Sequence, residues 1–427
     1  MKEDLNFHGN ELIQLQTFYT VGAVVGQIPF MFLFTYLPMH WVIPGLDIAW
    51  GIFTLLQYRT ASFAELAAYR FLVGWFEAAY FPGMHYIFGA WYRGDEIGRR
   101  GGVFYVGLSL GTLTAGLITA GASNNLEGVA GLAGWRWMYI ICALITIPVG
   151  VLGYFVLPGT PDKPNKWFLN DEDIAVAQAR LKDDGHHVGN ENVTWQTLKK
   201  VAMGWHFWVL IAFDFFFWNS GTQSVGGFLL WLKSLNRFSK GRTNELGAIA
   251  PALGIFYTLL TCFASDLILG PAWAITAIHV VHMLGNTILT VWDVPEAAKW
   301  FAFMLSYASV AMSSVLYGWV NTQLRGSPAQ RAFILVLINT TSQASTAWTH
   351  LLVFPTLDAP RFQKGYPYAI ANSALLILTA HGLRIWLKKK EWVSLFFLPL
   401  SEWWLGARAP EVNKALGPGC ELRTTLR

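Results

Sequence analysis

The chain has 427 residues, of which 54% are hydrophobic, 15% aromatic and only 13% charged, and its formal net charge is +4. A soluble fold cannot bury that much apolar surface, so the composition indicates an integral membrane protein in a lipid bilayer. The modest charge argues against a nucleic-acid partner, and three scattered cysteines exclude a disulfide framework or a cysteine metal cluster.

Eleven apolar runs predict membrane-spanning helices, because a helix of about 17–25 residues crosses the hydrocarbon layer. They cover residues 12–36, 43–58, 64–92, 101–122, 135–157, 206–231, 245–266, 272–292, 299–320, 332–355 and 368–387. The fold class is therefore all-α and polytopic. We expect an N-terminal helical half at 1–157, a linker at 158–205, a C-terminal helical half at 206–387 and a tail at 388–427.

The linker and the basic residues predict the orientation. Asn170 followed by Asp171, Glu172 and Asp173 is typical of a helix cap with an acidic first turn, which predicts a short amphipathic helix over 174–182. Lys and Arg are more frequent on the side of the linker and the tail, which places both in the cytoplasm. Eleven spans then put Met1 outside without a signal peptide, so we expect that a span is missing ahead of Met1.

Glu77 lies about midway along the run 64–92, where its short side chain reaches neither headgroups nor bulk water. An ionisable group at that depth usually faces the bundle interior or a water-filled path. Loss of water favours the neutral, protonated form of a carboxyl, which is what proton coupling requires. The other interpretation is a structural carboxyl held by a hydrogen bond.

Arg70, Gly74, Glu77 and Phe81 are spaced i, i+4, i+7 and i+11, so they share one helix face. Arg70 and Glu77 are about 10 Å apart along the axis, which makes a tight ion pair between them unexpected. Arg70 is suited either to an anionic substrate or to lipid headgroups. His85 lies nearby, as a core residue or a relay.

Polar residues also interrupt the apolar runs of the C-terminal half. Asp214 and Asn219 lie in the run 206–231, where Asp214 is either a second titrating group or a charge at the cytoplasmic end. Within the run 332–355, Asn339 and Gln343 are one turn apart in a polar patch. Such residues bind polar substrate groups or bond neighbouring helices. We interpret Asn219, Asn339 and Gln343 as substrate-binding candidates together with Arg70.

Motif searches leave no enzyme chemistry to assign. The chain has no phosphate-binding loop, zinc-ligand spacing or nucleophile elbow, so we expect neither an enzyme nor a bound cofactor or metal. Its glycines lie inside the apolar runs instead. The pair Gly22 and Gly26, and the series Gly107, Gly111, Gly116 and Gly121, predict close helix packing.

The segment Arg70-Phe-x-x-Gly74-x-x-Glu77-Ala78-x-x-x-Pro82-Gly83, followed by Trp91-Tyr92, resembles the fourth helix of the anion:cation symporter branch of the major facilitator superfamily. The chain is similar to fungal allantoate and pantothenate permeases. Further matching pieces are Met1-Lys-Glu-Asp-Leu5, Gly26-Gln27-Ile28-Pro29, Gly134-Trp135-Arg136-Trp137, Pro158-x-x-Pro161-Asp162-Lys163-Pro164, Leu230-Trp231-Leu232-Lys233-Ser234-Leu235 and Asp358-Ala359-Pro360-Arg361-Phe362.

The resemblance implies a proton-coupled carrier of a small carboxylate, monomeric and in the plasma membrane, with alternating access between two helical halves. It implies proton coupling for Glu77 and maps Arg70 onto the arginine of the same motif. The family's first helix precedes the Met1-Lys-Glu-Asp-Leu5 segment and is not part of this sequence. The alternative is therefore a receptor without transport or an inactive, truncated paralogue of the same fold.

Overall fold

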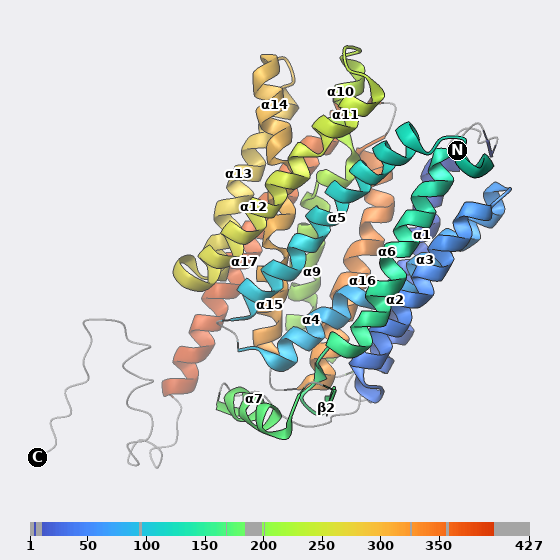
Figure 1. Cartoon of the computed structure of the whole chain (residues 1–427). Helices are drawn as coiled ribbons and strands as arrows, with labels where there is room; N and C mark the ends of the chain where they lie inside the picture. The colour runs from blue at the N-terminus through green and yellow to red at the C-terminus, as the bar shows by residue number, and fades with distance from the viewer. Residues whose placement is uncertain are drawn as a thin grey trace, which may run out of the picture. The chain divides into compact units, whose positions relative to one another are not determined.

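The computed structural model describes residues 4–5, 11–93, 96–167, 169–183, 199, 201–324, 327–355 and 358–396. The predicted tail from 397 onward, most of the linker after 183 and the Met1 segment lie outside the described residues, apart from 4–5 and 199. Residues 1–377 form one compact unit and 378–427 a second. The first unit holds every contact discussed below, and its described elements are almost all helices (Figure 1).

The helices before the linker follow the predicted runs. They are α1 (Glu11–Tyr36), α2 (Met39–Leu56), the 3₁₀ turn η1 (Gln57–Arg59), α3 (Phe63–Glu77), α4 (Tyr80–Trp91), α5 (Ile97–Asn125), the 3₁₀ turn η2 (Val129–Gly131) and α6 (Gly134–Val156). Packing joins α1 to α3, and α2 to both α3 and α6. The start of α3 is capped by Ser62, whose hydroxyl accepts a hydrogen bond from the amide of Glu65 at 3.3 Å.

The predicted continuous span 64–92 is two helices. The first, α3, ends at Glu77, and α4 begins at Tyr80 after a turn at residues 78 and 79. Pro82 explains the break, because proline has no amide hydrogen to donate to the carbonyl of Ala78 and its ring crowds that carbonyl. Glu77 therefore lies at a helix end beside a break, and not in the middle of an unbroken helix.

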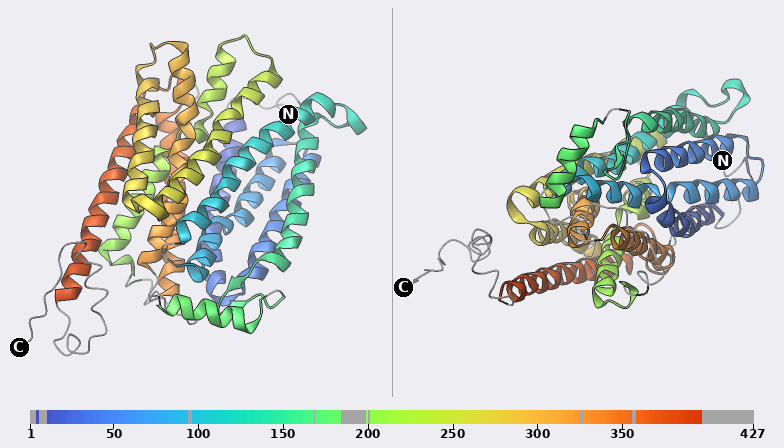
Figure 2. Two further views of the ribbon diagram at one scale, coloured as in Figure 1. Left: turned by 60° about the vertical axis from the view of Figure 1, so that its left-hand side comes forward. Right: turned by 90° about the horizontal axis from the view of Figure 1, so that it is seen from below.

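The described part of the linker confirms the predicted helix. Strands β1 (Gly159–Thr160) and β2 (Lys163–Pro164) pair antiparallel, and α7 spans Asp171–Asp183. The Asn170 side chain accepts a bond from the Asp173 amide at 2.8 Å, while the Asp173 carboxylate accepts one from the Asn170 amide at 3.4 Å. This reciprocal cap fixes the start of α7, which lies across the ends of the bundle helices (Figure 2).

The helices after the linker are more often interrupted. They are α9 (Trp205–Ser220), the 3₁₀ turn η3 (Gln223–Val225), α10 (Gly227–Ser234), α11 (Lys240–Gly247), α12 (Ile249–Ala264), the π-helical turn η4 (Ser265–Leu269), α13 (Pro271–Val291), α14 (Glu296–Met304), the 3₁₀ segment η5 (Leu305–Met312), α15 (Ser313–Gln323), α16 (Pro328–Val353) and α17 (Gly365–Phe396). The predicted spans 206–231 and 299–320 thus each contain a non-α segment, η3 and η5 respectively. Interrupted helices often line binding sites in transporters.

Seven helical stretches among the described residues are long and apolar enough to cross a membrane, judged by length and composition. They are Met39–Arg59, Ile97–Ala122, Gly134–Val156, Arg242–Leu269, Pro271–Val291, Glu296–Gln323 and Gly365–Lys389. The four remaining predicted spans coincide with α1, with α3 and α4, with α9 and α10, and with α16. The polytopic helical fold is confirmed, while the number of eleven crossings stays a prediction.

Glycines bring α1 and α3 into contact, as predicted for Gly22 and Gly26. A Cβ atom added at Gly22 would lie 2.2 Å from the Phe71 carbonyl oxygen, and one at Gly26 would lie 2.6 Å from that of Trp75. The same prediction is wrong for the series in α5, because a Cβ at Gly107, Gly111, Gly116 or Gly121 would meet nothing within 4 Å. These α5 glycines face open space and not a neighbouring helix.

Contacts also join the helices on either side of the linker. Helix α1 packs against α16, α5 packs against α12 and α15, and α4 packs against α15 and α16. The division into two halves at the linker stays a prediction. We call the end of the bundle beside β2 and α7 the linker end, and the end reached by α10, α11 and α14 the far end (Figure 1).

Candidate functional site

Glu77, the last residue of α3, has neighbours on both α1 and α3. The hydroxyl of Tyr19 in α1 lies beside its carboxyl, and the guanidinium of Arg70 attracts it electrostatically. No contact ion pair joins Arg70 to Glu77, as their spacing along α3 predicts. Both side chains are partly buried. The structure therefore brings together the two N-terminal residues that the sequence singles out and adds Tyr19.

Arg70 keeps unused hydrogen-bonding capacity. Its Nε atom is buried and has no hydrogen-bond partner among the described residues. Its charge also acts on Tyr19 and on Tyr139 of α6. A guanidinium with a free donor inside a helical bundle is suited to a carboxylate ligand, because its planar fork matches two carboxylate oxygens.

A second carboxyl near Glu77 was missed by the sequence interpretation. Asp47 in α2 is 8% exposed, its Oδ1 atom has no hydrogen-bond partner, and it interacts electrostatically with Glu77. Gly150 of α6 lets the two helices approach, since a Cβ there would lie 3.2 Å from the Asp47 Cβ. The signal was available, because Asp47 is an ionisable residue inside the predicted span 43–58.

Gln27 joins α1 to α16 in what we call the polar clasp, formed by Gln27, Asn339, Thr340 and Gln343. The Gln27 amide nitrogen donates to Gln343 Oε1 at 2.9 Å. Its oxygen accepts from Asn339 Nδ2 at 3.1 Å and from the Thr340 hydroxyl at 2.7 Å. Gln27 is 1% exposed and Asn339 fully buried. The structure thus places Asn339 and Gln343 against another helix and not along an open cavity.

Asn219 of α9 uses its whole amide within the protein. The nitrogen donates to the Phe215 carbonyl at 2.9 Å and to Ser345 Oγ at 2.7 Å. The oxygen accepts from the hydroxyls of Thr349 at 2.7 Å and Tyr368 at 3.0 Å. Asn219 is fully buried, so α9, α16 and α17 are tied together there. Its predicted substrate contact stays a prediction, and this arrangement leaves it no free polar atom.

Asp214 is fully buried in α9, and its position towards the cytoplasmic end stays a prediction. The hydroxyls of Tyr317 and Ser342 lie beside its carboxyl, yet neither carboxyl oxygen makes a well-formed hydrogen bond. The Tyr317 hydroxyl instead donates to Asn339 Oδ1 at 3.1 Å, which connects it to the polar clasp.

His85 of α4 is 2% exposed and lies among aromatic rings. Its Nδ1 atom is 3.0 Å from the Phe81 carbonyl, and its ring centroid is 4.8 Å from that of Tyr317. The rings of Phe81 and Tyr317 meet edge to face at 5.0 Å. These contacts favour the interpretation of His85 as a packed core residue at the contact between α4 and α15.

At the linker end, hydrogen bonds close the contact between α4 or α5 and the helices after the linker. The Ser314 hydroxyl donates to the Gly101 carbonyl at 2.6 Å, and Asn321 Nδ2 donates to the His85 carbonyl at 3.2 Å. Arg331, which is 4% exposed, donates to the Gly89 carbonyl at 2.6 Å. The buried carbonyls of α4 and α5 are thereby satisfied across the contact.

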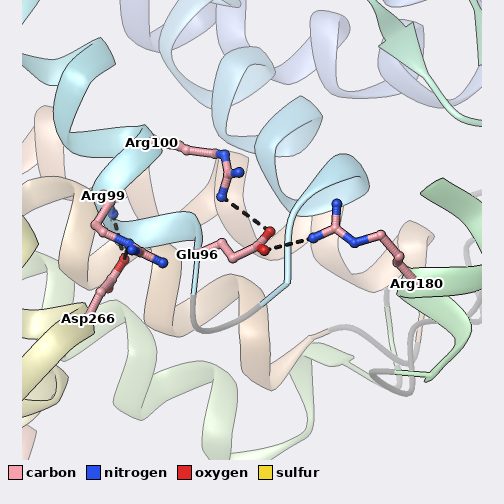
Figure 3. Close-up of polar contacts among 5 residues, drawn as sticks. All are labelled: Glu96, Arg99, Arg100, Arg180 and Asp266. Atoms are coloured by element: carbon pink, nitrogen blue, oxygen red, sulfur yellow. Dashed lines mark hydrogen bonds and ion pairs between the residues drawn. The ribbon is translucent and has the colours of Figure 1, made fainter. Parts of the chain in front are cut away.

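Ion pairs reinforce the same end (Figure 3). The carboxylate of Asp266 accepts a bond from the backbone amide of Arg99 at 2.7 Å and lies 3.4 Å from the Arg99 Nε. Glu96 pairs with Arg100 at 3.2 Å and with Arg180 of α7 at 2.7 Å. Asp266 also meets the N-terminus of α5, where helix amides favour a negative charge. The linker helix is thus bound to the loop before α5.

A pocket of about 180 Å³ opens at the broken part of α9 and α10, towards the far end of the bundle. Its polar lining comes from Thr112, Thr222, Gln223, Asn244, Ser306, Tyr307 and Tyr366. Gly116 lines it as well, which explains the open space beside that glycine. Arg70, Glu77, Asn219, Asn339 and Gln343 are not among its lining residues. The bundle therefore combines a closed linker end with a pocket nearer the far end.

Comparisons with known proteins agree with this arrangement. The family model described as Major Facilitator Superfamily matches residues 1–349. The vitamin H transporter of Saccharomyces cerevisiae is 39% identical over 92% of this chain and 67% of its own length. The pantothenate transporter liz1 of Schizosaccharomyces pombe is 30% identical over 86% of this chain and 71% of its own.

Solved structures give the same fold at low sequence identity. The proton:xylose symporter XylE bound to 6-bromo-6-deoxy-D-glucose has a TM-score of 0.60 and 16% identity, covering 90% of this chain and 88% of that one. The human organic anion transporter MFSD10 has a TM-score of 0.59 and 17% identity, covering 87% and 83%. At such identities the likeness concerns the fold alone.

Proposed function

The chain belongs to the Major Facilitator Superfamily and is a membrane transporter, not an enzyme, and we propose that it carries a small organic anion together with protons. The observation that carries this proposal is the position of Glu77, which lies inside the bundle between the hydroxyl of Tyr19 and the charge of Arg70. A carboxyl that alternates between a bound proton and an arginine partner can link proton and anion movement.

The substrate class is proposed from chemistry and from the relatives together. The relatives are named for vitamin H and for pantothenate, and each of these vitamins carries one carboxylate. Arg70 offers a buried donor without a partner, which suits one carboxylate. We therefore infer a vitamin-sized monocarboxylate as the substrate, of the vitamin H or pantothenate type.

The other proposed binding residues need a conformational change before they can act. Asn339 and Gln343 are occupied by Gln27 in the polar clasp, so they would offer their amides to a substrate only after α1 and α16 separate. Asn219 would have to give up bonds to Thr349 or Tyr368. We further propose that the transporter works as a monomer in the plasma membrane, with the linker and the C-terminus in the cytoplasm.

Uptake into liposomes tests the proposal. The purified 427-residue chain is reconstituted, and uptake of radiolabelled vitamin H and pantothenate is measured with an outside that is more acidic than the inside. We expect accumulation that a protonophore abolishes, and none of the neutral amide of the same vitamin. Uptake that ignores the pH gradient would contradict proton coupling. Binding of a vitamin without any flux would favour the receptor.

A further inference from the structure

The hydroxyl of Tyr317 has one proton and two possible acceptors. It donates that proton to Asn339 Oδ1 at 3.1 Å, and the carboxyl of Asp214 also lies beside this hydroxyl. Trp218 Nε1 donates to the hydroxyl oxygen at 3.4 Å. The indole has one N–H and no acceptor, so this contact gives the hydroxyl no second proton to donate. Tyr317 can therefore satisfy Asn339 or a charged Asp214, but not both.

Asp214 is held in surroundings that suit a neutral carboxyl. It is fully buried, both carboxyl oxygens lack a hydrogen-bond partner, and the neighbouring Ser342 Oγ lacks one too. A carboxylate in such a place would be costly, because a buried charge needs compensating donors. A neutral carboxyl therefore costs less in these surroundings than a carboxylate.

The groups around Asp214 are hydroxyls, so the carboxyl of Asp214 is the group in this cluster that can become charged near neutral pH. Tyr317 of α15 and Tyr105 of α5 are the titratable groups that interact with it, and Ser342 of α16 adds a hydroxyl. Among the described residues, no Lys, Arg, His or second carboxyl is recorded as interacting with Asp214. Loss of its proton would therefore draw on the Tyr317 and Ser342 hydroxyls.

Tyr317 controls the orientation of the Asn339 amide. Because its hydroxyl donates to Asn339 Oδ1, the amide nitrogen is turned towards Gln27 Oε1, where it donates at 3.1 Å. If Tyr317 turned to a charged Asp214, Asn339 Oδ1 would be left buried without a donor. The bond from Asn339 to Gln27 would then lose its orienting partner, and the polar clasp would weaken.

We propose that Asp214 is a second proton-binding carboxyl of the transporter, and that release of its proton to water redirects the Tyr317 hydroxyl from Asn339 and loosens the polar clasp between α1 and α16. The proposal rests on the proton-coupled function proposed above and gives the C-terminal helices their own part in it. Protonated Asp214 accompanies the closed clasp, and charged Asp214 accompanies an open one.

Pulsed EPR distances test this on the full chain. Spin labels replace Ile28 and Thr341, which are exposed neighbours of the clasp on α1 and α16, in a variant with Cys142, Cys262 and Cys420 replaced by alanine. Without substrate or gradient, we expect one short distance at acidic pH and a growing longer population as the pH rises. Asp214→Asn should keep the short distance at every pH.

Tyr317→Phe is a second variant, to be used in case Asp214→Asn does not fold. Elution as a single species in size-exclusion chromatography shows that a variant is folded. Tyr317→Phe removes the shared hydroxyl, so its distances should no longer respond to pH. Glu245→Gln removes a carboxyl of α11 that pairs with Arg242 and belongs to neither the clasp nor the Glu77 cluster, so it is the control and should respond like the parent. A pH response retained in Asp214→Asn or in Tyr317→Phe would overturn the inference.

The outcome is separable from that of the proposed function. If pH-driven uptake is present and Asp214→Asn still shows the parental pH response, the inference fails and the proposed function stands. If uptake ignores the pH gradient while the EPR distances follow Asp214, the switch exists without coupling. Both measurements use the same 427-residue chain, so the two results can be compared directly.

Discussion

The hydroxyl of Tyr19 in α1 lies beside the carboxyl of Glu77 at the end of α3. This contact lies next to the tightest approach of the two helices, where a Cβ added at Gly74 would be 2.1 Å from the Tyr19 carbonyl oxygen. The proposed coupling carboxyl is therefore held by a helix contact that tolerates little movement. Its protonation can act on α1 through Tyr19.

Replacement of Glu77 by glutamine should separate coupled from uncoupled transport. Glutamine keeps the size of the side chain and can accept from Tyr19, but it binds no proton. We expect loss of pH-driven accumulation with retained exchange of labelled for unlabelled substrate across the liposome membrane. Tyr19→Phe should weaken accumulation and not abolish it. Accumulation that survives in Glu77→Gln would assign the proton to another residue.

Replacement of Gly74 by alanine should destabilise the protein. Its Cβ would meet a backbone carbonyl of α1 that cannot turn aside, and overpacking of this kind costs about 1–3 kcal/mol. Gly116→Ala is the matched control, because its Cβ meets nothing within 4 Å and alanine favours a helix by roughly 0.5–1 kcal/mol. Thermal unfolding in detergent should give a lower Tm for the first variant only. Equal Tm values would mean that α1 and α3 can separate without cost.

Arg70 should set the preference for a carboxylate. A charge-assisted hydrogen bond contributes about 1.5–3 kcal/mol, so Arg70→Gln should raise KM for the vitamin by roughly ten- to a hundredfold. Arg70→Lys should be intermediate, because lysine keeps the charge and loses the fork. The check is whether the neutral amide of the vitamin competes with uptake: it should compete poorly in the parent and no worse than the acid in Arg70→Gln. An unchanged KM in Arg70→Gln would instead support the alternative that Arg70 contacts lipid headgroups.

The parts of this molecule that could be predicted from sequence depend on local chemistry. Eleven apolar runs coincide with helices, the Asn170 cap follows from neighbouring residues, and Glu77 is conspicuous because it is ionisable within an apolar run. The break near Ala78 could not be read from Pro82 alone, because Pro29, Pro44 and Pro148 lie inside helices that continue through them.

The remaining features depend on which helices face each other. Nothing in the sequence near Asn339 shows that its partner is Gln27, which is 312 residues away. For the same reason, an amide that is fully bonded, such as Asn219, cannot be told by sequence from one that awaits a ligand. The α5 glycines share the spacing of packing glycines but face open space, which at Gly116 belongs to the pocket.

Replacement of Asn219 can distinguish a structural role of this residue from a contact with the substrate. Asn219→Ala would leave the Tyr368 hydroxyl without its acceptor, and an unpaired buried group costs about 1–3 kcal/mol. It would also remove the bonds to Thr349 and Ser345, whose hydroxyls keep their backbone acceptors. We therefore expect a lower Tm and an unchanged KM in the folded fraction. A raised KM at an unchanged Tm would instead support the predicted substrate contact.

The native thiol of Cys262 can report opening of the linker end. Cys262 in α12 is fully buried, and a Cβ added at Gly102 of α5 would lie 2.8 Å from its sulfur. A water-soluble thiol reagent should therefore reach it only when α5 and α12 separate. The assay needs Cys142 and Cys420 replaced by alanine, so that labelling reports on one position.

Asp266 and Arg180 should contribute unequally to that closure. The Asp266 side chain is 7% exposed and accepts a hydrogen bond from the Arg99 amide. Asp266→Asn removes this charge-assisted contact, which contributes about 1.5–3 kcal/mol. We therefore expect Cys262 labelling to become at least about tenfold faster. The Arg180 side chain is 45% exposed, and such ion pairs contribute about 0–1 kcal/mol. Arg180→Gln should therefore change the rate by less than about fivefold. If it speeds labelling as much as Asp266→Asn does, the linker helix and not the α5 terminus controls the closed end.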